Sequence, residues 1–163
     1  MTFLTGNQGR NKILTHTDLC RLTAEKFCKA VAIYEVKAQE ENPDVITFYT
    51  GGTSVVFEIK MSRADFLADK KKKCRNEDFT RCGNFHAYVC NGDFIKKDEI
   101  PEDWGLYYYI NGKFKEIKSY YRGDGWLNNN KNWQTENSIL IKQIIGNQFF
   151  NKKNIVYNKR YKQ

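Results

Sequence analysis

The stretch NPDVITFYTGGTSVVFEIKMSRADF, residues 42–66, decides the fold. It reads as two apolar strands joined at a glycine pair, which is typical of a β-hairpin because glycine tolerates positive φ. These strands nevertheless contain three ionisable residues, Asp44, Glu58 and Lys60. Removing an ionised group from water costs several kcal/mol unless it is paired or bound to a metal. Their presence in an otherwise hydrophobic hairpin therefore indicates a functional site.

The register of this hairpin decides whether the three groups meet. A strict two-residue loop would pair Asp44 with Ile59, and the alternation of side chains would turn Asp44 away from the other two groups. A three-residue turn or a single bulge shifts the pairing by one residue. With the shift, Asp44 pairs with Lys60 and Ile46 with Glu58. We therefore predict a bulge or an odd-length turn, with all three ionisable residues on one face.

Two carboxylates on one face of a strand pair favour a bound cation. Asp44 and Glu58 would repel each other unless a cation lies between them, and oxygen ligands of this kind suit Mg²⁺ or Mn²⁺. Lys60 would lie beside the ion, where its ammonium group can orient an attacking water or stabilise charge on a phosphate oxygen. This arrangement predicts metal-assisted hydrolysis of a phosphodiester.

Positive charge follows the hairpin directly. A helix is expected from Ser62, because Ser62 and Asp65 have the spacing of a capping box, and its first amide groups would favour a phosphate. The residues expected to contact nucleic acid are Ser62, Arg63, Lys70, Lys71, Lys72 and Lys73. A net charge of +8 over 163 residues also favours a polyanionic partner, with nucleic acid first.

The remaining pattern predicts one α/β domain over 1–163 in which helices cover a mixed sheet. Apolar residues occupy both pleats of the central hairpin, so both faces of the sheet should be covered. The domain should have a core at about 17–118 and a C-terminal extension at 119–163. Helices are expected at 17–30, from residue 62 and at 136–150, and strands at 31–38, on each side of the glycine pair, at 84–90, and in a late hairpin that turns at Asn111 and Gly112.

Cysteine usage and hydropathy place the chain in a reducing compartment. No apolar run has the length of a secretory signal or a membrane span, so we expect a cytoplasmic protein with no membrane partner. A metal site around His86 is disfavoured because no CxxC pair is present, and His16 is interpreted as a surface residue. The five cysteines are scattered and odd in number, as expected for reduced thiols: Cys20, Cys28, Cys74, Cys82 and Cys90.

The loop at 120–133 interleaves aromatic and basic residues, among them Tyr120, Trp126, Lys131 and Trp133. This composition suits base stacking and phosphate contact, and it equally suits packing of the last helix. For the tryptophans, packing is the favoured interpretation.

The ionisable residues of the hairpin and their neighbours resemble the sequence signature of a known protein superfamily. The pair Pro43 and Asp44, followed by Glu58, Ile59 and Lys60, resembles the signature of the PD-(D/E)xK nuclease superfamily. The expected order of helix, three-strand meander, helix and strand resembles its restriction-endonuclease-like core. The continuations EIKMSRADFLADKKK, GNFHAYVC and IPEDWGLYYY are similar to the small MmcB-like proteins, which are described as DNA-repair nucleases of this superfamily.

The resemblance covers about 19–117 and implies a role for each residue of the signature. Asp44 and Glu58 would be metal ligands, the backbone carbonyl of Ile59 a third ligand, and Lys60 the catalytic lysine. The run KKKK stands where an aromatic residue is expected in relatives. A family pattern with no assigned role continues after the signature, at Ser62, Arg63, Asp65 and Asp69.

Some members of the superfamily use a further acidic ligand. Glu35, in the first strand, is the favoured candidate for this additional catalytic position. Glu25 lies about 120° from the centre of the apolar stripe of the first helix, which favours a solvent position. The expected activity is a Mg²⁺- or Mn²⁺-dependent deoxyribonuclease in DNA repair or processing, with a homodimer left open. The alternative is a non-catalytic module on the same fold that binds nucleic acid or a partner.

Overall fold

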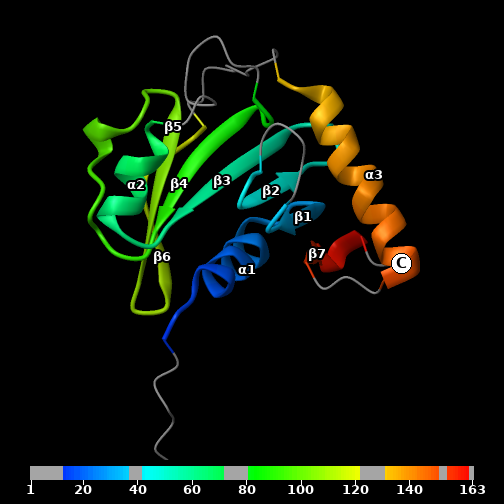
Figure 1. The fold of residues 1–163 in the computed structure, drawn as a ribbon, viewed down its shortest axis with the longest axis horizontal. Helices are drawn as coiled ribbons and strands as arrows, with labels where there is room; N and C mark the ends of the chain where they lie inside the picture. Colours follow the sequence, from blue (N-terminus) through cyan, green and yellow to red (C-terminus); the bar gives the residue numbers. More distant parts are fainter. Residues whose placement is uncertain (1–12, 37–41, 72–80, 122–130, 151–153, 162–163) are drawn as a thin grey trace, which may run out of the picture.

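The computed structural model describes residues 13–36, 42–71, 81–121, 131–150 and 154–161, which form a seven-stranded sheet with helices on both faces (Figure 1). None of the helices in these ranges has the length and apolar character needed to cross a membrane. The elements are α1 (His16–Phe27), β1 (Val31–Tyr34), β2 (Val45–Phe48), β3 (Ser54–Lys60), α2 (Arg63–Asp69), β4 (Phe85–Cys90), η2 (Lys97–Glu99), β5 (Trp104–Ile110), β6 (Lys113–Lys118), α3 (Trp133–Phe150), β7 (Ile155–Tyr157) and η3 (Lys159–Tyr161).

The sheet is mixed, in the order β6-β5-β4-β3-β2-β1-β7. The pairs β3–β4 and β4–β5 are parallel, and the other neighbours are antiparallel. The chain order is helix, three-strand meander, helix and strand, followed by a hairpin and a helix, as the sequence predicts. The prediction of an α/β fold with a mixed sheet is confirmed.

Both faces of the sheet are covered, because β3 alternates its side chains between two hydrophobic layers. Leu19 of α1 packs with the odd-numbered residues of β3, such as Phe57. On the opposite face, Val56 packs with Ile139 of α3, while Phe66 of α2 belongs to a cluster over β4 and β5. The central strands are therefore buried on both sides, as the apolar run predicts.

Several element boundaries differ from those predicted. Helix α1 begins at His16 rather than at residue 17, and its cap is Thr15, which forms a capping box with Asp18. Strand β1 ends at Tyr34 instead of running to residue 38, because Glu35 has a left-handed φ of 53°. Helix α3 begins at Trp133, before residue 136, because the side chain of Asn132 accepts a hydrogen bond from the N–H of Thr135. Strand β7, paired with β1, was not predicted.

Two local predictions are confirmed. The turn between β5 and β6 places Asn111 and Gly112 at positive φ, 51° and 75°, as a two-residue hairpin loop requires. Ser62 caps α2, and its hydroxyl accepts a hydrogen bond from the N–H of Asp65 at 3.2 Å.

The β2–β3 turn contains three residues, so the predicted odd-length turn is confirmed. Phe48 pairs with Ser54, and the N–H of Tyr49 donates to the carbonyl of Thr53, which leaves 50–52 as the loop. The predicted pairing itself is wrong, because the loop begins one residue earlier than assumed. Its third residue has the left-handed conformation, and Ile46 lies opposite Val56 rather than Glu58. If the pairing is extended by two residues from Ile46 and Val56, Asp44 lies opposite Glu58 rather than Lys60.

A buried ion pair holds the start of α3 against this turn. Lys131 Nζ lies 2.9 Å from Glu136 Oε2 and donates to the carbonyl of Gly52 and to Ser54 Oγ, each at 2.9 Å. Lys131 is thus a packing residue and not a nucleic-acid contact. Trp133 was expected to pack, but it is 51% exposed with the Lys131 ammonium 3.7 Å from its ring centroid. Trp126 lies outside the described residues.

The two glycines of the turn give a matched pair of variants. Gly52→Ala should lower the free energy of unfolding by about 1–2 kcal/mol, because its φ of +81° brings a Cβ too close to the following carbonyl oxygen. Gly51→Ala should change it by less than about 0.5 kcal/mol, because the added Cβ meets nothing within 4 Å. Urea denaturation measures both. Equal effects of the two substitutions would show that the conformation of Gly52 does not hold the turn.

Candidate active site

The buried thiol of Cys20 in α1 lies next to His16, which in turn contacts Asp44. Burial raises the pKa of this thiol above its ordinary value, and the negative charges of Asp44, Glu35 and Glu58 raise it further. These acids come from three segments of the chain, at the end of β1, at the start of β2 and within β3. A backbone hydrogen bond joins Glu35 to Asp44, but the three side chains contact different groups: Thr17 for Glu35, His16 and the N–H of Ile59 for Asp44, and Lys60 for Glu58.

The carboxylate of Asp44 is fixed from two sides. Its Oδ2 accepts a hydrogen bond from the N–H of Ile59 at 2.8 Å, and its Oδ1 lies 3.5 Å from Nε2 of His16. The carbonyl of Asp44 accepts a hydrogen bond from the N–H of Glu35 at 2.7 Å. Asp44 is thereby held against both β1 and β3, and its side chain remains 24% exposed. A ligand from solvent can reach it.

Glu35 lies just past the end of β1 rather than inside the strand. Its side chain accepts a hydrogen bond from the hydroxyl of Thr17 in the first turn of α1. A left-handed φ at a glutamate costs on the order of 1–3 kcal/mol and persists where surrounding contacts fix it, often at functional sites. Glu25 is exposed and pairs with Arg21 at 2.6 Å, as its predicted solvent position requires.

Glu58 and Lys60 form a buried network with two residues of the neighbouring elements. The exposed fractions of Glu58 and Lys60 are 4% and 2%. Lys60 Nζ lies 3.7 Å from Glu58 Oε2 and 3.2 Å from Asp69 Oδ1. The hydroxyl of Tyr88 donates to Asp69 Oδ2 at 2.9 Å. Asp69, for which the sequence gave no role, thus holds the lysine of the signature.

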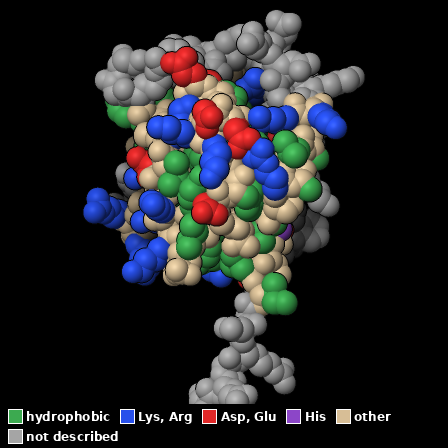
Figure 2. Space-filling view, turned by 90° about the vertical axis from the view of Figure 1, so that its left-hand side faces the viewer, with side chains coloured by type: hydrophobic (Ala, Val, Ile, Leu, Met, Phe, Trp, Pro, Cys, Tyr) green, Lys and Arg blue, Asp and Glu red, His purple; other side chains and the backbone are tan. Residues whose placement is uncertain are grey.

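The residues expected to bind nucleic acid do not act as one set. Arg63 donates to Glu99 through both terminal nitrogens, and this interaction lowers the pKa of Glu99 to about 2. Arg63 is therefore engaged within the protein. Lys70 and Lys71 are exposed, whereas Lys72 and Lys73 lie outside the described residues. On the side of the molecule that carries α2 and β6, basic side chains alternate with acidic ones (Figure 2).

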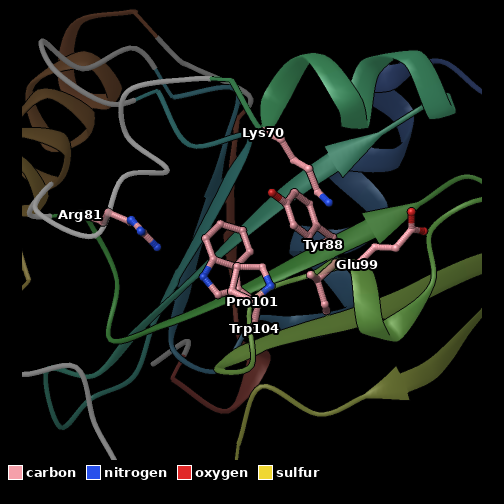
Figure 3. Close-up of a pocket in the computed structure, with 7 residues that line it drawn as sticks. Lys70, Arg81, Tyr88, Glu99, Pro101 and Trp104 are labelled. Carbon is pink, nitrogen blue, oxygen red and sulfur yellow. The ribbon is translucent and has the colours of Figure 1, made fainter.

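A cavity of about 360 Å³ lies next to the buried network, on the face of the sheet covered by α2. Tyr88 connects the two, because it lines the cavity and binds Asp69. Lys70 extends from the end of α2 towards Tyr88, and the ring of Tyr88 lies beside that of Trp104 (Figure 3). The lining residues are Lys70, Arg81, Tyr88, Glu99, Ile100, Pro101 and Trp104.

Sequence reasoning missed His16, which it assigned to the surface. The side chain is half-buried, next to Asp44 and 3.5 Å from the sulfur of Cys20. A helix predicted to begin one residue earlier, at His16, would have shown from the spacing of four residues that His16 and Cys20 share a face. His86 stacks on Trp104 with ring centroids 4.9 Å apart, which supports its expected role in packing. Cys74 lies outside the described residues.

No family model matches the chain, and no curated protein matches its sequence. The structure is similar to that of the SPO1766 protein of unknown function from Silicibacter pomeroyi. The TM-score is 0.52 at 16% sequence identity, and the match covers 75% of this chain and 82% of that chain. At this identity the similarity shows a shared fold.

The contact between His16 and Asp44 should appear in the titration of the imidazole. The hydrogen bond to Asp44 is the largest cause that raises the pKa of His16 above 6.5. Asp44→Asn should lower that pKa, which NMR titration of the metal-free protein measures. A His16 pKa that stays raised in Asp44→Asn would contradict the contact.

The raised pKa of His16 determines how its contribution to the stability of the fold changes with pH. Because the folded-state pKa of His16 is the higher one, its stabilising contribution is complete below the unfolded pKa of ~6.5 and is lost as the pH rises through the folded value. His16→Gln should therefore destabilise the protein more at about pH 5.5 than at about pH 8.5.

Proposed function

We propose that this protein is a metal-dependent nuclease that hydrolyses phosphodiester bonds of DNA. The proposal is carried by the position of the Asp44 carboxylate, which binds the backbone of Ile59 between Glu58 and Lys60. The order of elements, with a meander β1–β3 followed by α2 and the parallel strand β4, supports a restriction-endonuclease-like core. Two observations support a nuclease: the signature resembles that of the nuclease superfamily, and the Asp44 carboxylate contacts the backbone between Glu58 and Lys60.

The donor atoms fit a hard divalent cation. Asp44 and Glu58 would hold Mg²⁺ or Mn²⁺ through carboxylate oxygens, together with the carbonyl of Ile59. Asp44 reaches the N–H of Ile59, the residue after Glu58, whereas Glu58 is paired with Lys60 at 3.7 Å and would turn from this lysine to share an ion with Asp44. The ion, when bound, would polarise a phosphodiester and acidify a water molecule.

Lys60 would supply positive charge next to the scissile phosphate. It forms ion pairs with both Glu58 and Asp69. If Glu58 turns towards a metal ion, the contact with Asp69 still holds the ammonium group in place. Asp69 is itself oriented by the hydroxyl of Tyr88. We therefore assign Asp69 and Tyr88 the role of positioning Lys60.

The cavity beside this network is where we place a nucleotide of the substrate. Its lining includes the cationic Lys70 and Arg81, which suit a phosphate, whereas the ring of Trp104 is fully buried and already stacked on His86. The net charge of +8 would draw the polyanion to the protein.

A second candidate function, nucleic-acid binding without cleavage, is favoured by the burial of Glu58 and Lys60. Exposed fractions of 4% and 2% mean that a substrate must reach both groups past Asp44 or after a local opening. The two functions differ in one measurable respect, since the binding module would retain DNA affinity without hydrolysing DNA in Mg²⁺ or Mn²⁺.

Asp44→Asn should lower the rate of plasmid cleavage by at least about a hundredfold, because it removes a charged metal ligand and with it several kcal/mol of transition-state stabilisation. The asparagine carbonyl can still accept the hydrogen bond from Ile59, so the fold should persist. Cleavage in Mg²⁺, in Mn²⁺ and with a chelator, next to a melting curve, measures both effects.

The matched control is Asp98→Asn, the same change at an exposed acid in η2. It should cleave like the unmodified protein. Undiminished cleavage by a folded Asp44→Asn protein would place the nuclease centre elsewhere. DNA binding without cleavage by the unmodified protein under all metal conditions would favour the binding module.

A further inference from the structure

Three different metal-ligating side chains converge on the exposed edge of the candidate active site. His16 Nε2 lies 3.5 Å from Asp44 Oδ1, and the sulfur of Cys20 lies 3.5 Å from Nδ1 and 4.0 Å from Nε2 of His16. One ligand atom from each residue falls within 4.8 Å of the other two. The set combines nitrogen, sulfur and oxygen, and so differs from the all-oxygen set proposed for Mg²⁺.

These separations suit a tetrahedral ion with three protein ligands. Typical zinc distances, about 2.0–2.1 Å to nitrogen and oxygen and about 2.3 Å to sulfur, place nitrogen about 3.4 Å from oxygen and about 3.6 Å from sulfur. His16 Nε2 lies 3.5 Å from the Asp44 oxygen and 4.0 Å from the sulfur, and because the sulfur is nearer to Nδ1, at 3.5 Å, the imidazole would rotate to point Nε2 between the other two ligands. The fourth position would be left to water.

The fold holds each of the three side chains in place. His16 and Cys20 are four residues apart on α1 and so share one face, and the capping box of Thr15 fixes the first turn of that helix. The second oxygen of Asp44 accepts the hydrogen bond from Ile59, an outer contact of the kind that orients metal ligands.

The surroundings favour a cation that can enter from solvent. The charge of Glu35 acts on both His16 and Cys20, as does that of Asp44. The side chain of His16 is 41% exposed and that of Asp44 is 24% exposed, so an ion can reach the buried sulfur between them.

We propose that His16, Cys20 and Asp44 form a binding site for a thiophilic divalent transition-metal ion, of which Zn²⁺ is the type. Thiolate and imidazole ligands select such ions over Mg²⁺. The site shares Asp44 with the proposed oxygen-ligand site but does not depend on nuclease activity. Because one carboxylate serves both sets, an ion held by Cys20 and His16 competes for Asp44 with an ion held by Glu58.

Titration of the full, reduced and metal-free chain with Co²⁺ tests this site. The expected result is one equivalent of bound Co²⁺ with a thiolate-to-cobalt charge-transfer band in the near ultraviolet, which Zn²⁺ then abolishes. Cys20→Ser should remove the band. Cys28→Ser is the matched control at the other end of α1, where the thiol donates to the carbonyl of Val156, and it should leave the band unchanged.

Because Cys20 is fully buried, a second variant guards against loss of folding. His16→Ala, at a half-exposed position, should lower Zn²⁺ affinity at least about tenfold. The proposal is overturned if the unmodified chain shows no such band, if the band persists in Cys20→Ser, or if His16→Ala binds Zn²⁺ unchanged. A chain that gives the cobalt band but cleaves no DNA would refute the proposed nuclease activity and leave this site intact.

Discussion

The three-residue turn at 50–52 fixes the register of β2 against β3, and the candidate site depends on that register. With this turn, residues that face each other across the two strands have the same parity, and Asp44 directly precedes Val45, which pairs with Phe57. The N–H of Ile59 donates to the Asp44 carboxylate at 2.8 Å. The Lys131 ammonium binds the carbonyl of Gly52, so the start of α3 keeps the turn in this form.

Two buried charge networks in this protein have different physical roles. The pair of Lys131 and Glu136 joins α3 to the central hairpin, and its contacts are fully explained by packing. The network of Lys60 with Glu58 and Asp69 joins β3 to α2 and, through Tyr88, to β4, and hydrophobic residues of similar volume often replace a buried ion pair at no loss of stability. Retained charges in the second network are what the proposed nuclease function would require.

Local chemistry made much of the fold predictable. The glycine pair, the Ser62 cap and the turn at Asn111 and Gly112 each depend on a few adjacent residues, and all three are present. The alternation of apolar residues in β3 correctly predicted two covered faces.

The remaining features depend on contacts between distant segments. The starting residue of the β2–β3 loop decides which of two odd-length registers forms, and the sequence does not distinguish them. His16 looked like a surface residue because its partner Asp44 lies far away in sequence and meets it when α1 packs on the sheet. β7 escaped prediction because a three-residue strand carries little pattern and is defined by its pairing with β1.

Anomalous diffraction from crystals soaked in Mn²⁺ would test the central claim most directly. The account predicts a manganese peak at about 2.1 Å from carboxylate oxygens of Asp44 and Glu58 and from the carbonyl oxygen of Ile59. A well-ordered site without manganese at these three groups, or manganese bound elsewhere on the protein, would contradict it.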